Sequence, residues 1–332
     1  MTPRISVLMP CFNQGAFIGE AIDSVLAQTF QDFEIIVVDD GSTDPLTQDT
    51  LSQLATPRTI VLKTENQGLP SARNHAAGHA SGAFLCALDA DDKLASTWFE
   101  KAVKTLDEQP DVSFVSHWLE TFGDEHWAWK PERCDLPALL ARNTVNGAAI
   151  VRREAFDAVG GYDESMRDGC EDWDFWLRLV ERGFAGTIIP DVLFYYRRRA
   201  ASMSREMLDE QRYRRPLETL IAKHEEAYRR HLPAILAAKE AEAQHLVREI
   251  ATIEHDRVLS LEPARRRARE ELAAVARKAE RARGERAREE EHERLRWKAA
   301  ELEREVAAVR ASWSWRLTAP LRTLYSIVRG RS

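Results

Sequence analysis

Residues 34–42 read EIIVVDDGS, and this stretch determines how the surrounding sequence is interpreted. Ile35 to Val38 is an unbroken apolar run, which is typical of a strand buried on both faces of a sheet. Asp39 and Asp40 follow directly at the carboxyl end of this predicted strand, which is where α/β sheets bind their ligands. Taken alone, the same residues are equally well explained as a turn and a helix start.

On both sides of this stretch, β-rich runs alternate with amphipathic stretches over the first ~200 residues. This alternation predicts an α/β domain with a mostly parallel sheet covered by helices. Strands are expected at Ile5–Met9, Glu34–Val38, Thr59–Leu62, Ala83–Leu88 and Val112–Ser116. Helices are expected around Ala16–Ala27, Pro70–His79 and Ser96–Glu108.

A second acidic motif, Leu88-Asp89-Ala90-Asp91-Asp92, ends the apolar run at residues 83–88. Its three carboxylates repel one another unless a cation or hydrogen bonds compensate. Oxygen ligands select hard cations, so Mg²⁺ or Mn²⁺ is the expected cofactor, and the choice between them stays open. An acidic helix N-terminus explains this motif as well when it is taken alone.

A third acidic segment, GCEDWDFWLR at residues 169–178, places three acids close together. By itself it reads as the start of a helix, because acids complement the helix macrodipole there.

These segments belong to an ordered series that closely resembles the family 2 glycosyltransferases. The series is ISVLMPCFN at 5–13, QTF at 28–30, IVVDDGSTD at 36–44, NxG at 66–68, ARN at 72–74 and LDADD at 88–92. The resemblance covers residues from about 4 to 200 and implies a GT-A fold, in which a nucleotide-binding α/β unit is joined to an acceptor-binding half.

The resemblance also implies roles for individual residues. Pro10, Phe12 and Asp40 would line the nucleobase pocket, with Asp39 beside them, and Arg73 would approach the nucleotide. Asp89 and Asp91 would form the D-x-D motif, with Asp91 as the direct metal ligand. Asp172 would be the catalytic base. Donor or acceptor contacts are expected from Asn146, Gly147, Glu171 and Trp173.

Other classes lack their signatures. No G-x-G-x-x-G follows the first strand, and no P-loop or H-E-x-x-H pattern is present. Residues 1–205 carry 19 Lys and Arg against 31 Asp and Glu, which argues against a nucleic-acid surface. The four cysteines are far apart and suggest neither a disulfide framework nor a zinc site, so we expect a cytoplasmic protein. No apolar run approaches the ~18 residues of a membrane span.

The composition changes after residue 205 to Ala, Glu, Arg and Leu. We expect a catalytic domain at 1–205, a helical linker at 206–232 and a helical region at 233–311. A 4-3 apolar spacing starts at Leu261, fails at Arg286 and Glu289, and resumes out of phase at Leu295. This spacing predicts a coiled coil that joins chains as a parallel dimer, and a solvated single helix is the alternative.

Residues 312–332 combine Trp313, Trp315 and Leu321 with four arginines and no acid. This basic amphipathic pattern predicts a contact with an anionic membrane, at the inner face of the plasma membrane. Packing of the same face on the protein's own helices is the alternative.

Taken together, we expect an inverting transferase that moves one sugar from a nucleotide diphosphate sugar to a glycan or lipid-linked acceptor, in cell-surface polysaccharide biosynthesis. The Q-x-x-R-W motif of processive synthases is absent, which favours single transfer. A transferase-like scaffold that has lost activity and a nucleotidyltransferase are the alternatives.

Overall fold

The computed structural model describes residues 2–199, 210–281 and 287–311. The chain divides into two compact units, Met1–Leu236 and Ala237–Ser332. The strands of the described residues are β1 (Ile5–Cys11), β2 (Phe33–Asp40), β3 (Thr59–Thr64), β4 (Phe84–Ala87), β5 (Lys93–Leu94), β6 (Val112–Gly123), β7 (Ala128–Trp129), β8 (Ile150–Arg152) and β9 (Ala185–Arg198). The helices are α1 (Ile18–Leu26), α2 (Pro45–Ser52), α3 (Leu69–His79), α4 (Trp98–Glu108), α5 (Leu136–Ala141), α6 (Arg153–Val159), α7 (Glu171–Glu181), α9 (Glu210–Lys223), α10 (Glu225–Arg281) and α11 (Ala287–Ala311).

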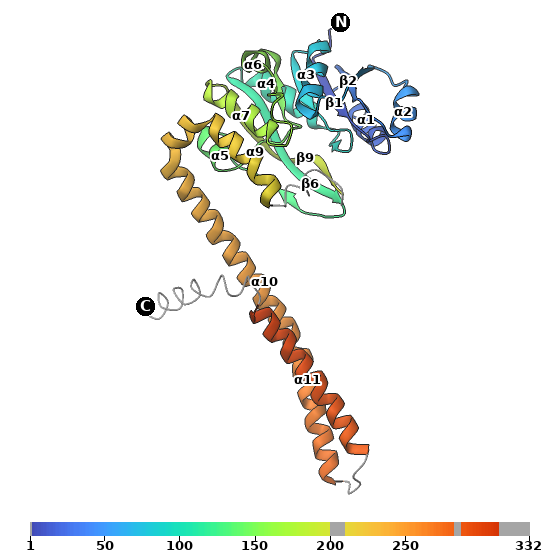
Figure 1. Cartoon of the computed structure of the whole chain (residues 1–332), viewed down its shortest axis with the longest axis vertical. Helices are drawn as coiled ribbons and strands as arrows, with labels where there is room; N and C mark the ends of the chain where they lie inside the picture. The colour runs from blue at the N-terminus through green and yellow to red at the C-terminus, as the bar shows by residue number, and fades with distance from the viewer. Residues whose placement is uncertain (1, 200–209, 282–286, 312–332) are drawn as a thin grey trace. The chain divides into compact units, whose positions relative to one another are not determined.

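The first unit is built on one sheet with the strand order β3-β2-β1-β4-β8-β6-β9-β5, and β7 pairs with β6 (Figure 1). The ladders among β3, β2, β1 and β4 are parallel. Beyond β4 the sheet is mixed, because β8 runs antiparallel to β4 and β6, while β9 runs parallel to β6. The expected α/β fold is confirmed, with a mixed sheet in which the first half is wholly parallel and the second half combines parallel and antiparallel ladders.

Alternation along the central strands divides the apolar side chains between two cores. In β2, Ile35 and Val37 belong to a core with α1 and α4, whereas Ile36 and Val38 belong to a core with α3 and α7. All four side chains are fully buried. A strand covered by helices on both faces has to be apolar at every position, which is the pattern that the sequence shows at residues 35–38.

The helices begin where the sequence provides caps. Asp44 accepts a hydrogen bond from the backbone N–H of Thr47 at 2.9 Å, and Pro45 occupies the first turn of α2. In α1, Ile18, Ala21, Ile22 and Val25 are buried at i, i+3, i+4 and i+7, so one face of the helix covers the sheet.

The first unit extends beyond the expected boundary at residue 205. Leu220 and Ile235, from α9 and the first turns of α10, are buried in the same core as α7. Leu217 and Tyr228 pack against that core. The predicted linker at 206–232 is therefore corrected in its described part, because its helices bury apolar side chains in the first unit, which ends at Leu236.

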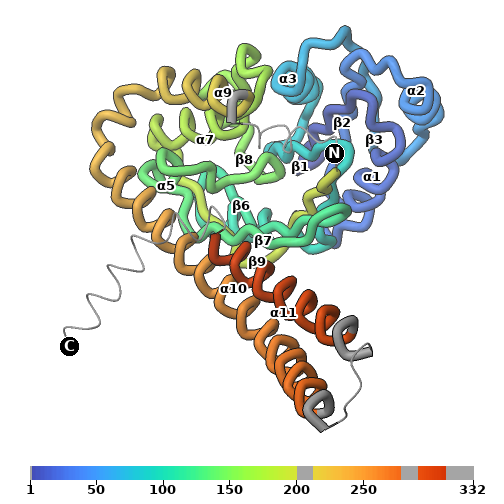
Figure 2. The backbone as a smooth tube through the Cα atoms, turned by 60° about the horizontal axis from the view of Figure 1, so that its bottom comes forward, coloured from blue at the N-terminus to red at the C-terminus, as the bar shows by residue number. Residues whose placement is uncertain are grey.

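In the second unit, α10 and α11 lie side by side (Figures 1 and 2). Glu303 lies 3.8 Å from Arg265 and 3.7 Å from Arg269. Glu303 lies 16 residues after the start of α11, and Arg265 lies 16 residues before the end of α10, so the helices are antiparallel. Ala268, Val306 and Val309 are buried.

Three residues of the predicted 4-3 face, Ala268, Val306 and Val309, are thus buried within one chain. Of the two positions where the spacing fails, Glu289 lies in α11 and Arg286 lies outside the described residues. The structure holds a single chain, so the predicted parallel dimer stays a prediction. In the described residues no helix combines the length and the apolar character needed to cross a membrane. The predicted membrane contact at residues 312–332 lies outside the described residues.

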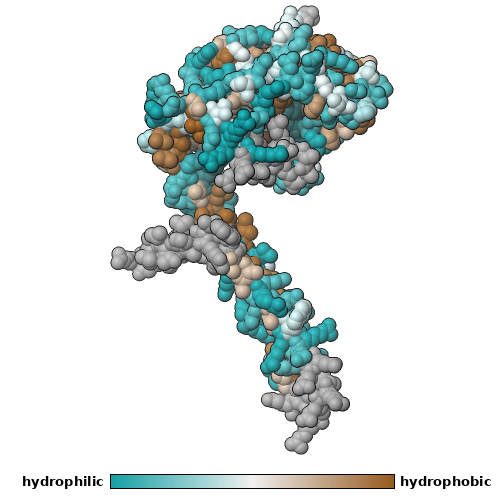
Figure 3. All heavy atoms as spheres, in the orientation of Figure 1, coloured by the Kyte–Doolittle hydropathy of each residue, from teal (hydrophilic) through white to brown (hydrophobic). Residues whose placement is uncertain are grey.

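The surface in view is dominated by hydrophilic residues, with hydrophobic residues in small groups (Figure 3). Leu246 and Ile253 of α10 are 51% and 66% exposed. Trp127, in the first unit, is 45% exposed although it is a large aromatic residue.

Candidate active site

A cleft of about 920 Å³ lies in the first unit and is lined by the segments that follow β1, β2 and β4 and by the start of α7. The chain order changes direction at β1, which pairs with β2 on one side and β4 on the other. Ligands of α/β sheets bind at such a switch point. Most of the residues that the sequence singles out line this cleft, namely Pro10, Phe12, Asp40, Arg73, Asp89, Asp91, Asn146, Gly147, Glu171 and Asp172.

Asp39 and Asp40 differ in what their side chains do. Asp39 is buried, accepts a hydrogen bond from the N–H of Ser42 at 2.9 Å and is not among the lining residues, so its expected place in the nucleotide pocket is corrected to a turn. Asp40 lines the cleft, and its two oxygens accept hydrogen bonds from the N–H groups of Gln67 and Gly68 at 2.9 and 2.8 Å. Asp40 therefore holds the loop before α3 against the end of β2.

The acids after β4 are balanced by arginines that come from distant parts of the sequence. Asp89 accepts a hydrogen bond from Arg73 at 2.8 Å, and Asp91 accepts one from Arg199 at 2.5 Å. Burial raises the pKa of Asp91, and the charge of Asp89 adds to the rise. Asp92 is fully buried and accepts a hydrogen bond from the N–H of Arg197 at 2.7 Å, and burial raises its pKa well above the ordinary value.

Asp89 and Asp91 fit a divalent cation that binds together with a diphosphate. Among the described residues, no three His, Cys, Asp or Glu side chains converge to hold an ion by themselves. Mg²⁺ requires no such cage, since it keeps several waters and binds through one or two carboxylates and the phosphates of a substrate. Two partly exposed carboxylates on the wall of a cleft provide this kind of donor set.

The third acidic segment begins α7 inside the cleft. Cys170 precedes the helix with a φ of 61°, in the left-handed region where a non-glycine residue is strained. Glu171 is buried and accepts a hydrogen bond from Arg73 at 2.8 Å. Arg73 is itself buried and also contacts Asp89, so it connects the acids after β4 to the start of α7.

Asp172 has an altered acidity. Its carboxylate accepts hydrogen bonds from the N–H of Trp173 at 2.7 Å and from the Nδ2 amide of Asn143 at 3.2 Å. Burial and the charge of Glu171 raise the pKa of Asp172 to about 7, although Arg73 and these hydrogen bonds act in the opposite direction. A carboxylate with a pKa near neutrality is suited to accept a proton at the pH of a cell.

Trp173 does not contribute to the cleft. Its side chain is buried in the core, and its indole N–H donates to the carbonyl of Leu139 at 2.7 Å. The expected donor or acceptor contact of Trp173 is therefore corrected to a packing role, because the helical turn directs it away from the cleft that Asp172 lines.

Asn146 and Gly147 support the cleft through their local geometry. Asn146 is buried, and its side-chain oxygen accepts the N–H of Ala148 at 3.0 Å. A Cβ atom at Gly147 would lie 3.4 Å from the Nη2 atom of Arg73, so the absence of a side chain leaves room for the arginine.

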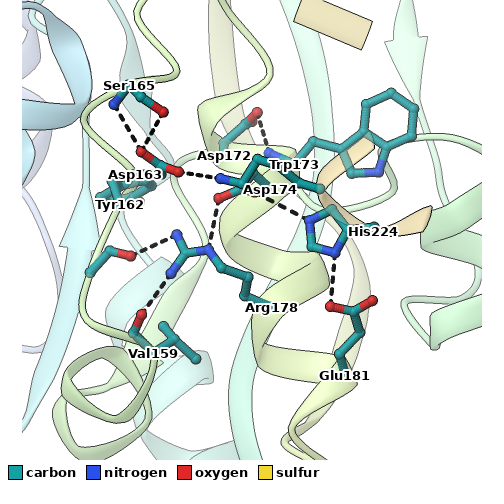
Figure 4. Close-up of polar contacts among 12 residues, drawn as sticks. Val159, Tyr162, Asp163, Ser165, Asp172, Trp173, Asp174, Arg178, Glu181 and His224 are labelled. Carbon is teal, nitrogen blue, oxygen red and sulfur yellow. Dashed lines mark hydrogen bonds and ion pairs between the residues drawn. The ribbon is translucent and has the colours of Figure 1, made fainter. Parts of the chain in front are cut away.

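Behind the cleft, Asp174 is fully buried and ties α7 to the helices that follow the sheet (Figure 4). It lies 2.7 Å from Arg178 and Lys223 and 3.2 Å from His224. The other ring nitrogen of His224 lies 2.8 Å from Glu181, and Lys223 also pairs with Asp163. This cluster fixes the helix whose first turn carries Asp172.

Several lining residues were not selected from the sequence, namely Asn143, Arg167, Trp127, Trp129 and Tyr213. They come from loops, from strand β7 or from helix α9, and no local motif distinguishes them. Arg199 belongs to the run Tyr195–Arg199, which the sequence marks as basic without indicating which arginine faces the cleft. The structure directs Arg199 to the cleft, whereas Arg198 pairs with Glu125 at 3.0 Å.

Comparison with known proteins agrees with this geometry. The family profile Glycosyl transferase family 2 matches residues 6–162, and the profile Glycosyltransferase like family 2 matches residues 134–251. The chain is 31% identical over 183 residues to a PGL/p-HBAD biosynthesis glycosyltransferase of Mycobacterium bovis, a match that spans 53% of this chain and 69% of the relative. It is 36% identical over 223 residues to the uncharacterized glycosyltransferase EpsJ of Bacillus subtilis, spanning 61% of this chain and 64% of that protein.

Among solved structures, S. aureus TarS residues 1–349 in complex with UDP-GlcNAc matches with a TM-score of 0.53 and 23% identity. The match covers 60% of each chain, so it concerns the fold of the first unit and spans less than two thirds of that protein. The sheet, the acidic cleft and the sequence matches lead to one assignment, and the chain belongs to glycosyltransferase family 2 and is a glycosyltransferase.

Proposed function

We propose that this glycosyltransferase moves a single sugar from a nucleotide diphosphate sugar to an acceptor hydroxyl with inversion at the anomeric carbon. The acceptor is a growing surface glycan or its lipid-linked precursor. The observation that supports this best is the bridge made by Arg73, which lies 2.8 Å from both Asp89 and Glu171. It brings the acids suited to a diphosphate-bound cation next to the helix turn that carries Asp172.

The donor would occupy the part of the cleft near the ends of β1 and β2. Phe12 is 46% exposed and lines the cleft, so its ring is available to pack against a nucleobase. Asp89 and Asp91 would hold Mg²⁺ or Mn²⁺ against the diphosphate. The TarS protein that binds UDP-GlcNAc shares the fold of this unit, which supports a nucleotide sugar as donor.

In the reaction, Asp172 accepts the proton of the acceptor hydroxyl while the hydroxyl oxygen forms a bond to the anomeric carbon. The bond from that carbon to the diphosphate breaks on the opposite face, and its electron pair leaves with the nucleoside diphosphate. One displacement of this kind inverts the configuration. A bound divalent cation supplies positive charge that offsets the charge developing on the leaving diphosphate.

The variant Asp172→Asn tests the base. We expect transfer to fall by about 10² to 10⁴ because the amide cannot accept the proton. Binding of nucleoside diphosphates in the presence of Mn²⁺ should be unchanged, as measured by titration calorimetry. Asp111→Asn, a substitution of an exposed aspartate before β6, is the matched control. Wild-type transfer rates in Asp172→Asn would show that another group is the base.

The variant Asp91→Ala tests the cation. Binding of UDP, GDP or CDP by the wild-type protein should tighten when Mn²⁺ is added, and Asp91→Ala should lose this dependence because the ion loses a ligand. Equally tight binding by the wild-type protein in EDTA would exclude a cation at this site.

A further inference from the structure

An aromatic surface lies on the part of the cleft formed by β6, β7 and β9. Trp129 pairs with Leu119 in the β6–β7 ladder, and Leu119 pairs with Phe194 in the β6–β9 ladder. In the neighbouring row, Thr121 pairs with Tyr196. Leu119 and Thr121 lie two residues apart in one strand, so both rows face the same side of the sheet.

Trp127 completes the second row. The N–H of Thr121 donates to the carbonyl of Trp127 at 2.9 Å, and the N–H of Trp127 donates to the hydroxyl of Thr121 at 2.8 Å. Trp127, Trp129, Leu119, Phe194 and Tyr196 all line the cleft. We call these five residues of the two rows together the aromatic row, and Leu119 is its one aliphatic member.

Trp127 is more exposed than the apolar residues beside it in the aromatic row. Leu119 and Phe194 are buried, and Trp129 packs partly on the core, whereas Trp127 keeps 45% of its surface exposed. Exposure of so large an apolar side chain forgoes the hydrophobic gain of burial. One backbone hydrogen bond and one bond from the N–H of Trp127 to the hydroxyl of Thr121 hold the hairpin in place, and the indole N–H of Trp127 donates to Glu125 at 3.5 Å. The ring is thus held by the hairpin while 45% of the residue stays exposed.

The aromatic row is separated from the proposed donor side. Pro10 and Phe12 follow β1 at the parallel end of the sheet, whereas the aromatic row belongs to β6, β7 and β9. The strands β4 and β8 lie between β1 and β6 in the sheet order. Asp89 and Asp91 follow β4, so the acids come from a strand between the two surfaces.

We propose that the aromatic row, through Trp127, stacks against a pyranose ring of the acceptor, so that the acceptor is a carbohydrate chain. This inference rests on the proposed function, because it assigns the second substrate of the same cleft. A pyranose ring carries C–H groups on one face and hydroxyls around its edge. The electron-rich face of an indole packs well against such C–H groups, and pockets with aromatic walls and a few polar groups suit ligands of this kind.

Saturation-transfer NMR with a panel of neutral methyl pyranosides and disaccharides tests the surface directly. We expect the wild-type protein to transfer magnetisation to the ring C–H protons of at least one probe. Trp127→Ala should weaken this binding about tenfold, as expected for the loss of one aromatic contact. Trp127→Phe should restore most of it, and Trp297→Ala, which removes a tryptophan that is 60% exposed on α11, should have no effect.

Donor-side measurements separate this inference from the proposed function. Binding of nucleoside diphosphates with Mn²⁺ should be the same in Trp127→Ala and the wild-type protein, and the melting temperatures should agree. A parallel loss of nucleoside diphosphate binding would place the aromatic row on the donor side and overturn the inference. No transfer from the wild-type protein to any pyranoside would overturn it as well. Failure of the wild-type protein to bind any nucleoside diphosphate would instead contradict the proposed function.

Discussion

At the scale of single residues, the proposed transfer depends on the acidity of the Asp172 carboxyl group. The charged groups that face Asp172 come from several elements, and Asn143 adds a hydrogen bond to its carboxylate at 3.2 Å. The titratable groups that interact with it are Glu171, Arg73, Cys170, Tyr162 and Tyr213. The outcome is a carboxyl group whose pKa is raised to about 7.

This pKa predicts the pH dependence of transfer. The base acts only when Asp172 is deprotonated, so kcat/KM should increase with pH through a limb near pH 7. Asn143→Ala removes a hydrogen bond to the charged form, which raises the pKa further and moves the limb to higher pH. At pH 6 we expect about a fivefold loss, from a hydrogen bond worth roughly 1 kcal/mol. A limb at the same pH in Asn143→Ala and the wild-type protein would contradict this role of Asn143.

At the scale of elements, the cluster around Asp174 joins α7 to the last residue of α9 and to His224, which lies between α9 and α10. His224 is buried between Asp174 and Glu181 (Figure 4). Burial lowers the pKa of His224, but the hydrogen bonds to the two carboxylates outweigh burial and raise it overall. Lys223 and Arg178 face the same carboxylate of Asp174, and Asp163 faces Lys223. The position of the helix that carries Asp172 therefore depends on residues about 50 positions further along the chain.

Stability should accordingly depend on the protonation of His224. A raised pKa means that its contribution is complete below the unfolded-state pKa, near 6.5, and is lost as the pH rises through the folded-state pKa. His224→Gln should lower the free energy of unfolding by roughly 1–3 kcal/mol at pH 6, and by less at pH 9. Urea titrations at both pH values measure this, with His255→Gln, an exposed histidine of α10, as the control. An equal loss at both pH values would mean that the charge of His224 is not involved.

At the scale of the whole molecule, the 4-3 apolar spacing of the helical extension fits two arrangements, a hairpin within one chain and a parallel dimer of two chains. The face at Leu295, Leu302 and Val306 has the spacing of a coiled coil, and the structure packs α11 against α10 of the same chain. A parallel dimer would instead pair each segment with its own copy. An antiparallel hairpin needs only a short connection, and α11 begins six positions after the end of α10.

Engineered cysteines distinguish the two arrangements. In Arg265→Cys/Glu303→Cys, mild oxidation should form a disulfide within one chain, because these positions face each other in the hairpin. Arg266→Cys/Glu303→Cys is the matched control, since Arg266 pairs along its own helix with Glu270. Denaturing electrophoresis without reductant would show a compact monomer for the first pair. A covalent dimer would favour the parallel arrangement.

The amino-acid pattern alone was enough to predict β1 to β4, the first part of β6, the helices α1, α3 and α4, and the order of the acidic motifs. These features are local, because a strand buried on both faces is apolar throughout and a helix shows its buried face at i, i+3 and i+4. The acids Asp40, Asp89 and Asp91 were predictable as one group, because the carboxyl ends of parallel strands share an edge of the sheet. Asp172, at the start of α7, was expected in the same site only from the family resemblance.

The neighbours of each charged or aromatic residue follow from the folded structure and have no signal in the sequence. Trp173 is buried and Trp127 is exposed because of the way in which α7 and the β6–β7 hairpin pack. The pairing of Arg73 with Glu171 joins positions 98 residues apart, and the inclusion of α9 in the first unit joins elements that share no motif. Such contacts arise from packing between residues far apart in the sequence, where many weak interactions add up. They produce no regular spacing of residue types from which they could be predicted.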